Sequence, residues 1–166
     1  MSANALTKTP AIREVYTWFG AAALDASCLE LDVLIILLLA AHLENPDVSE
    51  EALAARDTTL DGKSMGQLLA ELRRTFGLPD ETATVLAEAL AKRNFLIHHF
   101  WRERGPLLGS PEGCDAMCKE LSTLSDTLRR ALGHTSGIAQ ALGERVGIPP
   151  SVAAADVARL WKHQNE

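Results

Sequence analysis

This sequence has few cysteines, few aromatic residues and no net positive charge, and each of these features argues against a class of protein. Only three cysteines occur among 166 residues, which argues against a disulfide framework and favours a reducing compartment. Aromatic residues make up 5% of the chain, and no segment alternates polar and apolar residues as a half-buried strand does. Both features argue against a β-sheet protein. The formal net charge of −6 argues against a protein that coats nucleic acid duplexes non-specifically.

The sequence also lacks a clear membrane-targeting segment. Its first residues, MSANALTKTPAIREV, have no apolar core of the kind found in signal peptides. The most apolar run, Leu31 to Ala41, is too short to span a bilayer, and Asp25, Glu30 and Asp32 interrupt its extension. We therefore expect a cytoplasmic protein without a membrane partner.

What the sequence contains is typical of a globular helical protein. Apolar residues make up 47% and charged residues 23%, and alanine and leucine dominate. A chain of this length has room for one core and is too short for two ordinary domains. We predict a single all-α domain over residues 1–166. A bundle of four main helices covers 11–132, and one or two short helices form a C-terminal extension over 133–166.

Helix start and stop signals set the expected boundaries. Thr9 and Pro10 have the residue types of an N-cap and first helical position, and Gly77 and Gly133 are expected to end helices. The main helices are expected over 11–43, 65–76, 79–104 and 111–132, with shorter ones within 47–62 and over 136–146 and 151–162.

Two charged residues interrupt the apolar stripes of these helices. On a wheel of about 100° per residue, Glu30 lies near the centre of the first helix's stripe, whereas Glu14, Asp25 and Asp32 lie opposite. Arg93 lies in the middle of the third helix's stripe. The two stripes comprise Ile12, Phe19, Ala23, Ala26, Leu34, Leu37 and Ala41, and Val85, Leu86, Ala89, Leu90, Leu96, Ile97 and Phe100.

A lone buried charge is costly, so buried ions are normally paired. The sequence therefore predicts that Glu30 and Arg93 meet, directly or through one bridging group. The pair either serves a functional site or only fixes helix register. Removing one partner of a buried pair is expected to cost roughly 3–5 kcal/mol.

The segment KRNFLIHHFWRER, residues 92–104, carries the chemistry that favours a nucleic acid ligand. It holds four basic residues against one acid, with two histidines and three aromatic residues interleaved. That mixture is suited to phosphate contacts and base stacking on RNA. The candidate RNA-binding residues are Lys92, Phe95, His99, Trp101, Arg102 and Arg104.

Asn94 and His98 are four residues apart and share one side of a helix. Arg93 and His98 are five apart, about 140° around the helix, so one helix does not easily bring both to one phosphate. Two copies facing each other across a two-fold axis would make such a site. A homodimer is therefore the expected assembly.

Arg93-Asn94-Phe95-Leu96-Ile97-His98 resembles the Arg-x4–6-His motif of the HEPN superfamily (higher eukaryotes and prokaryotes nucleotide-binding), on the third main helix of a helical bundle. With Ser27-Cys28-Leu29-Glu30 and Met65-Gly66-Gln67-Leu68-Leu69, the chain is similar to an uncharacterised bacterial HEPN-like group over roughly Ala11 to Leu132.

The resemblance implies a metal-independent endoribonuclease that acts as a dimer, with no cofactor. A ribose 2′-hydroxyl attacks the adjacent phosphate and leaves a cyclic phosphate and a 5′-hydroxyl. His98 would move the proton, Arg93 would offset phosphate charge and Asn94 would orient the group. Such proteins often act as toxins or defence effectors with an antitoxin partner. The alternative is a non-catalytic HEPN-like module that binds RNA or a protein.

Other candidates are weaker. Cys114 and Cys118 have the spacing of a two-ligand metal clip, but no further Cys or His pair accompanies them, so no metal site is expected. The C-terminal helices resemble a helix-turn-helix, yet the second offers only Arg159 and Lys162 as strong donors, so specific DNA binding is not expected. Trp18 and Trp161 are expected to anchor the core or an interface.

Overall fold

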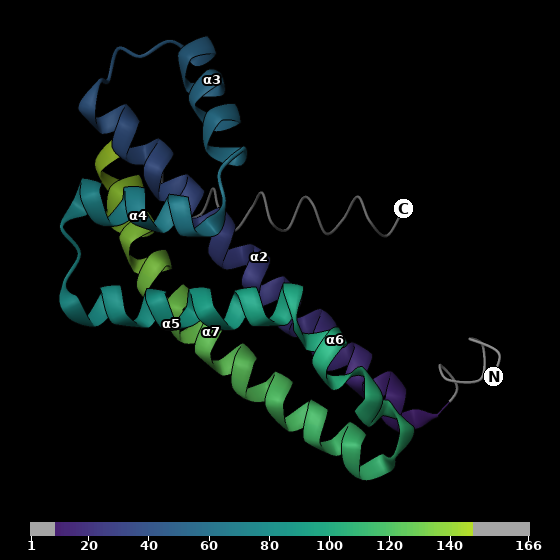
Figure 1. Cartoon of the computed structure of the whole chain (residues 1–166). Helices are drawn as coiled ribbons and strands as arrows, with labels where there is room; N and C mark the ends of the chain where they lie inside the picture. Colours follow the sequence, from purple (N-terminus) through teal and green to yellow (C-terminus); the bar gives the residue numbers. More distant parts are fainter. Residues whose placement is uncertain (1–8, 148–166) are drawn as a thin grey trace. The chain divides into compact units, whose positions relative to one another are not determined.

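The computed structural model describes residues 9–147, and every regular element in that part is a helix (Figure 1). The all-α prediction is thereby confirmed. The elements are α2 (Pro10–Glu44), α3 (Glu50–Asp61), α4 (Met65–Phe76), α5 (Asp80–His98), α6 (Phe100–Arg104), the 3-10 helix η1 (Gly105–Gly109) and α7 (Pro111–Val146). The helix expected over 151–162, with Arg159, Trp161 and Lys162, lies outside the described residues.

The chain divides into two compact units, each built from separate stretches of sequence. In its described part, unit 1 comprises residues 9–31 and 77–134, and unit 2 comprises 32–76 and 135–147. Both boundaries fall inside long helices, α2 and α7. The predicted limit of the helical core, at residue 132, lies two residues before the end of the second stretch of unit 1.

Unit 1 contains an aromatic cluster that packs α6 against the first part of α2. Phe100 is fully buried, and its ring lies 5.7 Å from Phe19, 6.1 Å from Phe95 and 5.4 Å from Trp101, between ring centroids. Trp101 in turn packs against Tyr16 and Phe19 at 5.2 and 4.8 Å. Edge-to-face and tilted ring pairs of this kind add to the stabilisation from burial alone.

The buried stripe of α2 differs from the one that the helical wheel predicts. Ile12, Ala26 and Leu37 are buried as expected, but Phe19, Ala23, Leu34 and Ala41 are only partly so. Val15, Ala22, Leu29 and Ile36 are fully buried and recur every seven residues, and Ala26, Val33 and Ala40 form a second buried series with the same spacing. An ideal wheel drifts by about 20° per heptad from such a repeat, so over this long helix it assigns the wrong face.

The shift of the buried face away from the one that the helical wheel predicts also corrects the placement of two acidic residues. The helical wheel places Asp25 and Asp32 on the outer side of the helix, but both accept bonds from α7. Within unit 1, Asp25 accepts from Ser125 and pairs with Arg129 at 3.0 Å. Within unit 2, Asp32 accepts from the hydroxyls of Thr135 and Ser136 at 2.9 and 2.8 Å. In each unit a polar contact thus accompanies the apolar packing of α2 and α7.

Unit 2 packs α3 and α4 around a leucine-rich core. Ser49 caps α3, since its hydroxyl accepts from the Ala52 amide at 3.2 Å. Ser64 and Gln67 form a capping box at the start of α4, with bonds of 2.8 and 3.4 Å. The core side chains of this unit include Val33, Ile36, Leu37, Leu60, Met65, Leu68, Leu72 and Leu142.

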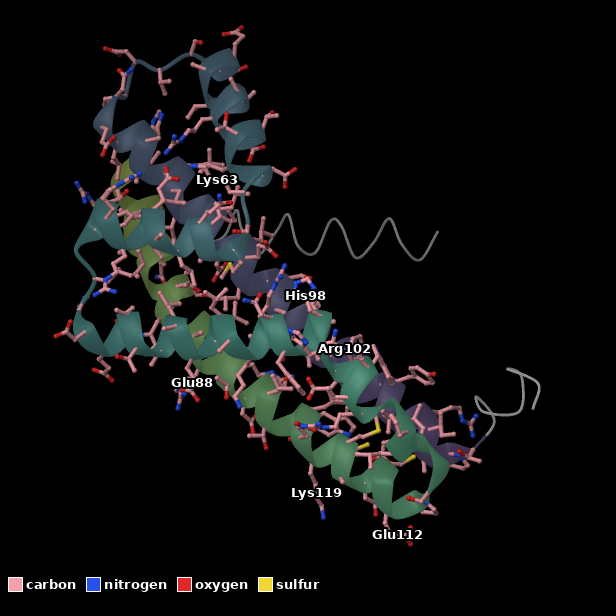
Figure 2. All side chains as sticks on the ribbon, viewed as in Figure 1. Lys63, Glu88, His98, Arg102, Glu112 and Lys119 are labelled. Atoms are coloured by element: carbon pink, nitrogen blue, oxygen red, sulfur yellow. The ribbon has the colours of Figure 1, made fainter. Side chains whose placement is uncertain are left out.

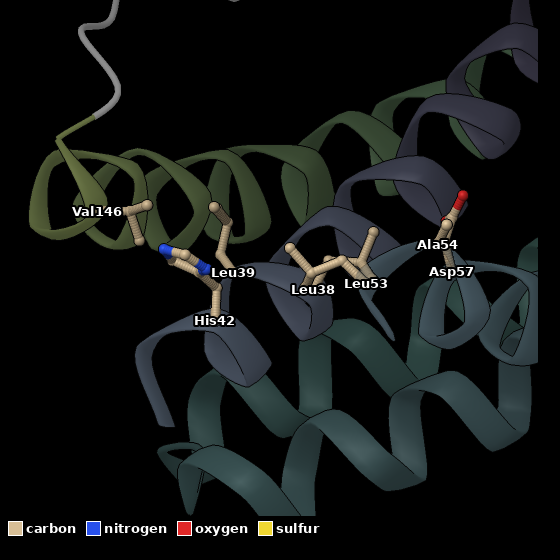
Figure 3. Close-up of a pocket in the computed structure, with 7 residues that line it drawn as sticks. All are labelled: Leu38, Leu39, His42, Leu53, Ala54, Asp57 and Val146. Carbon is tan, nitrogen blue, oxygen red and sulfur yellow. The ribbon is translucent and has the colours of Figure 1, made fainter. Parts of the chain in front are cut away.

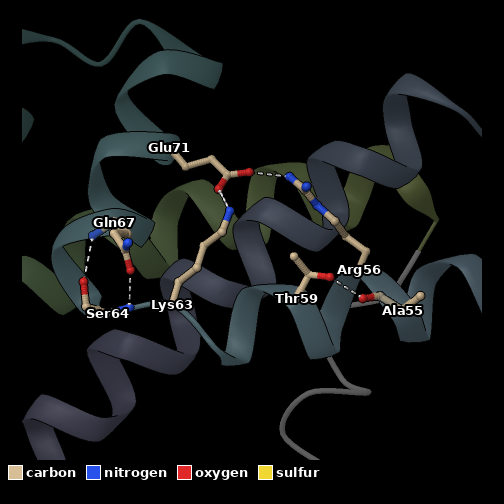
Figure 4. A network of polar contacts seen from close by, with 7 residues as sticks. All are labelled: Ala55, Arg56, Thr59, Lys63, Ser64, Gln67 and Glu71. Atoms are coloured by element: carbon tan, nitrogen blue, oxygen red, sulfur yellow. Dashed lines mark hydrogen bonds and ion pairs between the residues drawn. The ribbon is translucent and has the colours of Figure 1, made fainter.

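Unit 2 also contains a buried carboxylate with two cationic partners. Figure 4 shows Arg56 of α3 and Lys63, which precedes α4, both reaching Glu71. Only 7% of the Glu71 side chain is exposed. The Lys63 hydrogen bond is the largest cause of a lowered pKa at Glu71, Arg56 adds to it, and burial opposes both. The charged form is therefore favoured in the folded protein.

Two predicted helix ends are wrong. The helix expected to reach Arg104 is interrupted at His99, whose φ and ψ are −123° and −32°, and resumes as α6. The helix expected to end at Gly133 continues as α7 to Val146. Glycine weakens a helix by about 1 kcal/mol but does not stop it, unless the backbone takes a positive φ. Gly77 and Gly147, with φ of 55° and 83°, follow the ends of α4 and α7.

α2 is the one described helix that is long and apolar enough to cross a membrane, by length and composition only. A third of its most apolar window is buried inside the structure (33%). The core helix of a soluble protein meets the same criterion, so this feature is weak evidence. The expectation that no segment spans a membrane stays a prediction.

Gly113 occupies a position in α7 that no larger residue fits. A Cβ atom there would lie 2.1 Å from the backbone oxygen of Leu107. We expect Gly113→Ala to destabilise the protein by about 1 kcal/mol, because an overpacking cost of roughly 1–3 kcal/mol is partly offset by the better helix propensity of alanine. Denaturant unfolding measures the change. Gly133→Ala, where a Cβ meets nothing within 4 Å, is the control and is expected to stabilise.

Candidate functional site

The predicted contact between Glu30 and Arg93 is confirmed. Within unit 1, the Arg93 Nη2 atom donates to Glu30 Oε2 at 3.1 Å. The two side chains are 21% and 34% exposed, however, so this ion pair is not buried. Arg93 lies between the buried positions Ala89 and Leu96 of α5, yet its side chain and that of Glu30 are both partly exposed to water. The expected cost of 3–5 kcal/mol for breaking the pair is therefore too high.

Asn94 extends this pair into a short chain of polar contacts. Its Oδ1 atom accepts from Arg93 Nη1 at 3.4 Å, while Nη2 of the same guanidinium binds Glu30. Two contacts thus fix the guanidinium plane. Since Oδ1 accepts from Arg93, the amide nitrogen of Asn94 is the group left to donate to a ligand.

His98 is the last residue of α5, and its side chain is exposed. It lies one helical turn beyond Asn94, on the same side of the helix. Figure 2 shows it at the end of α5, with Arg102 close by on α6. The backbone irregularity at His99 follows immediately, so His98 stands at the corner where the chain leaves α5.

His99 and Arg102 contact each other rather than forming part of the Arg93 chain. The Arg102 Nη2 atom lies 2.6 Å from His99 Nδ1. A guanidinium only donates, so Nδ1 is the acceptor in this contact. The ring centroids of His98 and His99 are 6.4 Å apart. His99 therefore lies beside His98, but its hydrogen-bond partner is Arg102.

The remaining candidate RNA-binding residues lie elsewhere in unit 1. Trp101 is partly exposed and packs against three aromatic rings of the core cluster, and its role as an RNA-binding residue stays a prediction. Arg104 binds Glu120 through two bonds of 2.7 and 2.9 Å and lies over the Phe95 ring at 5.3 Å. The hydrogen bond that Arg104 donates to Glu120 raises the pKa of Arg104 above its usual value. Lys92, Phe95 and Arg104 line a common cavity, described below.

The cysteines show no metal-binding arrangement in the described part of the chain. Cys114 is buried, and its thiol points to the Leu108 carbonyl at 3.9 Å. Burial is the largest cause of a raised pKa at Cys118, and Glu14 adds to it, which favours the neutral thiol. No group of three or more His, Cys, Asp or Glu side chains among residues 9–147 is placed to hold a metal ion.

Unit 2 contains an apolar cavity that the sequence did not reveal. It measures about 450 Å³ and is lined by leucines of α2 and α3 and by Val146. Figure 3 shows His42 and Asp57 as its polar members. The His42 Nδ1 atom is buried and has no hydrogen-bond partner in the described structure. The lining offers few groups that would orient a polar ligand.

Searches with the sequence and the structure against protein-family models, curated proteins and solved structures return no match. Any functional assignment for this chain therefore depends on its own residues and on the resemblance of the Arg93–His98 motif.

We expect Glu30→Gln to leave the protein folded and to cost less than about 1 kcal/mol, because water screens a partly exposed pair. Urea unfolding of the two single variants, Glu30→Gln and Arg93→Gln, and of the double variant measures the coupling between the two side chains. A loss of about 3 kcal/mol or more in either single variant would restore the interpretation of a buried pair.

Proposed function

We propose that this protein is a metal-independent endoribonuclease of the HEPN type, acting as a homodimer with a composite site. The observation that carries the proposal is the exposed imidazole of His98, one turn from an Arg93–Asn94 pair that Glu30 orients. A proton-transfer group, a cation and an amide donor thus lie along one short stretch of α5.

The residues have distinct roles in this proposal. The RNA 2′-hydroxyl attacks the adjacent phosphorus, the bond to the 5′-oxygen breaks, and a 2′,3′-cyclic phosphate and a 5′-hydroxyl result. An imidazole can accept and donate protons near neutral pH, so His98 takes the proton of the attacking 2′-hydroxyl and delivers it to the leaving 5′-oxygen. Arg93 offsets the charge that develops on the phosphate oxygens, and the Asn94 amide nitrogen donates to one of them.

Exposed apolar side chains next to these residues support a two-fold interface. In unit 1, Leu24, Leu31 and Ile97 are 59%, 56% and 45% exposed. Leu31 follows Glu30 in sequence, and Ile97 lies one turn from Arg93. A second copy covering them would remove apolar surface from water and bring a second Arg93–His98 motif to the site.

One observation favours the alternative, a non-catalytic module that binds RNA or a protein. Glu30 already compensates the charge of Arg93 in the free protein, which weakens its attraction for a phosphate. In this alternative the protein retains RNA or partner binding without cleavage. As a toxin or defence effector, the nuclease would require an antitoxin or another protein that restrains it.

Incubation of total RNA and a tRNA pool with the full-length protein in EDTA tests the proposal. We expect cleavage, with cyclic-phosphate and 5′-hydroxyl ends. The oligomeric state is measured by light scattering on the same sample. Absence of cleavage across these RNA classes would favour the binding module, and cleavage by a monomer would contradict the composite site.

A further inference from the structure

Unit 1 contains a second candidate binding site, a cavity of about 480 Å³ between α5, α6 and α7. Its size is within the range of about 300–1,000 Å³ typical of small-molecule sites. Its lining combines charged, aromatic and aliphatic groups. The lining residues are Glu88, Ala91, Lys92, Phe95, Arg104, Glu120, Thr123 and Leu124.

Arg104 gives this cavity a flat, fixed surface. Glu120 holds its guanidinium through two bonds of 2.7 and 2.9 Å, to Nε and Nη2. The guanidinium carbon lies 5.3 Å from the centre of the Phe95 ring, so the plane is supported by an aromatic face. Nucleobases stack well on guanidinium planes and aromatic rings, and such a surface needs no rearrangement to bind one.

The charges around the cavity leave one cation uncompensated. Glu88 pairs with Arg130, and Glu120 pairs with Arg104. Among the residues that the structure describes, Lys92 makes no ion pair, and its side chain lines the cavity. The site therefore combines a stacking surface with one ammonium group that is available to an anion.

We propose that this cavity binds one nucleotide of a single-stranded RNA, with the base on Arg104 and the phosphate at Lys92. The identity of the ligand rests on the proposed function. Phe95, which lines the cavity, and His98 are three residues apart on α5 and are therefore neighbours on the helix surface. The cavity holds a nucleotide that neighbours the cleaved bond and fixes the position of the strand.

Binding of adenosine 5′-monophosphate to the full-length protein, followed by amide NMR shifts, tests the cavity directly. Adenosine and ribose 5-phosphate serve as separate probes of the two halves of the site. We expect saturable binding of the nucleotide, with shifts around α5, α6 and α7. For Lys92→Ala we expect about tenfold weaker nucleotide binding and unchanged adenosine binding.

Thr123→Trp is the blocking variant. Thr123 is exposed, and its hydroxyl binds only the Lys119 carbonyl of its own helix, so an indole there fills the cavity without breaking a tertiary contact. We expect at least about tenfold weaker nucleotide binding. Asp126→Trp, at an exposed position of α7 that does not line the cavity, is the matched control and should bind like the wild type.

No saturable binding to the wild type, or equal binding by Thr123→Trp, would overturn the proposal. These outcomes are separate from a failure of the nuclease. If the wild type binds the nucleotide, Thr123→Trp does not, and no RNA is cleaved, the nucleotide site is supported and the nuclease is contradicted. If His98→Ala abolishes cleavage while Thr123→Trp binds the nucleotide and cleaves RNA like the wild type, the nuclease is supported and the nucleotide site is contradicted.

Discussion

Replacement of His98 by alanine is expected to lower RNA cleavage by at least about 100-fold while the protein stays folded. Removing a group that transfers a proton in the transition state typically costs this much. The side chain is exposed at the end of α5, so its loss creates no cavity and strands no buried partner. Initial cleavage rates in EDTA, with circular dichroism and unfolding curves of both proteins, measure the effect.

His99→Ala is the matched control for this experiment. It removes the neighbouring imidazole, which accepts a bond from Arg102 and is part of no contact with Arg93 or Asn94 in the described structure. We expect its cleavage rate to fall by less than about tenfold. Equal losses in the two variants would indicate a general basic surface, and an unchanged rate in His98→Ala would contradict the nuclease mechanism.

Glu71→Gln is expected to cost about 2 kcal/mol of unfolding free energy at pH 7. The substitution removes a buried carboxylate and leaves the partly exposed side chains of Arg56 and Lys63 without a counterion. The full cost of breaking a buried pair is roughly 3–5 kcal/mol, and solvent exposure of both cations reduces it. Chemical denaturation of the full-length protein and the variant measures the difference.

The pH dependence of this difference follows from the lowered pKa of Glu71. A carboxyl group whose pKa is lowered by folding contributes stability above its unfolded value of 4.5, and that stability is lost as the pH falls through the lower folded value. The gap between wild type and Glu71→Gln should therefore be complete at pH 7 and narrow below pH 4.5.

Asp61→Asn, an exposed carboxylate at the end of α3 in the same unit, is the control for charge alone. We expect it to change the stability by less than about 0.5 kcal/mol at either pH. A difference between wild type and Glu71→Gln that stays constant from pH 7 to pH 3 would show that the network does not depend on the charge of Glu71.

The Glu30–Arg93 contact shows what a pattern of residues predicts well. Each charge interrupts an apolar run, and such a charge needs a partner, whichever way the helices cross. The degree of burial was not predictable in the same way, because it depends on which neighbouring side chains close over the pair. The structure leaves both groups partly exposed.

The wheel of α2 shows where the pattern fails. Its buried positions follow two seven-residue series, one from Val15 to Ile36 and one from Ala26 to Ala40, and the difference from an ideal helix accumulates along its length. The helical wheel therefore places Asp25 and Asp32 on the wrong side. Similarly, glycine marks a helix end only where the backbone takes a positive φ, and the residue type alone does not distinguish Gly133 from Gly77.

The residues alone predict the all-helical class, most helix starts and the pairing of Glu30 with Arg93. These follow from local propensity, from capping residues and from the cost of an unpaired charge. Packing of the helices sets which face of α2 is buried and brings Arg56 and Lys63 to Glu71. It also places Arg104 and Glu120 in the wall of a cavity. Such contacts join residues from different helices, and their geometry depends on packing that no single helix contains.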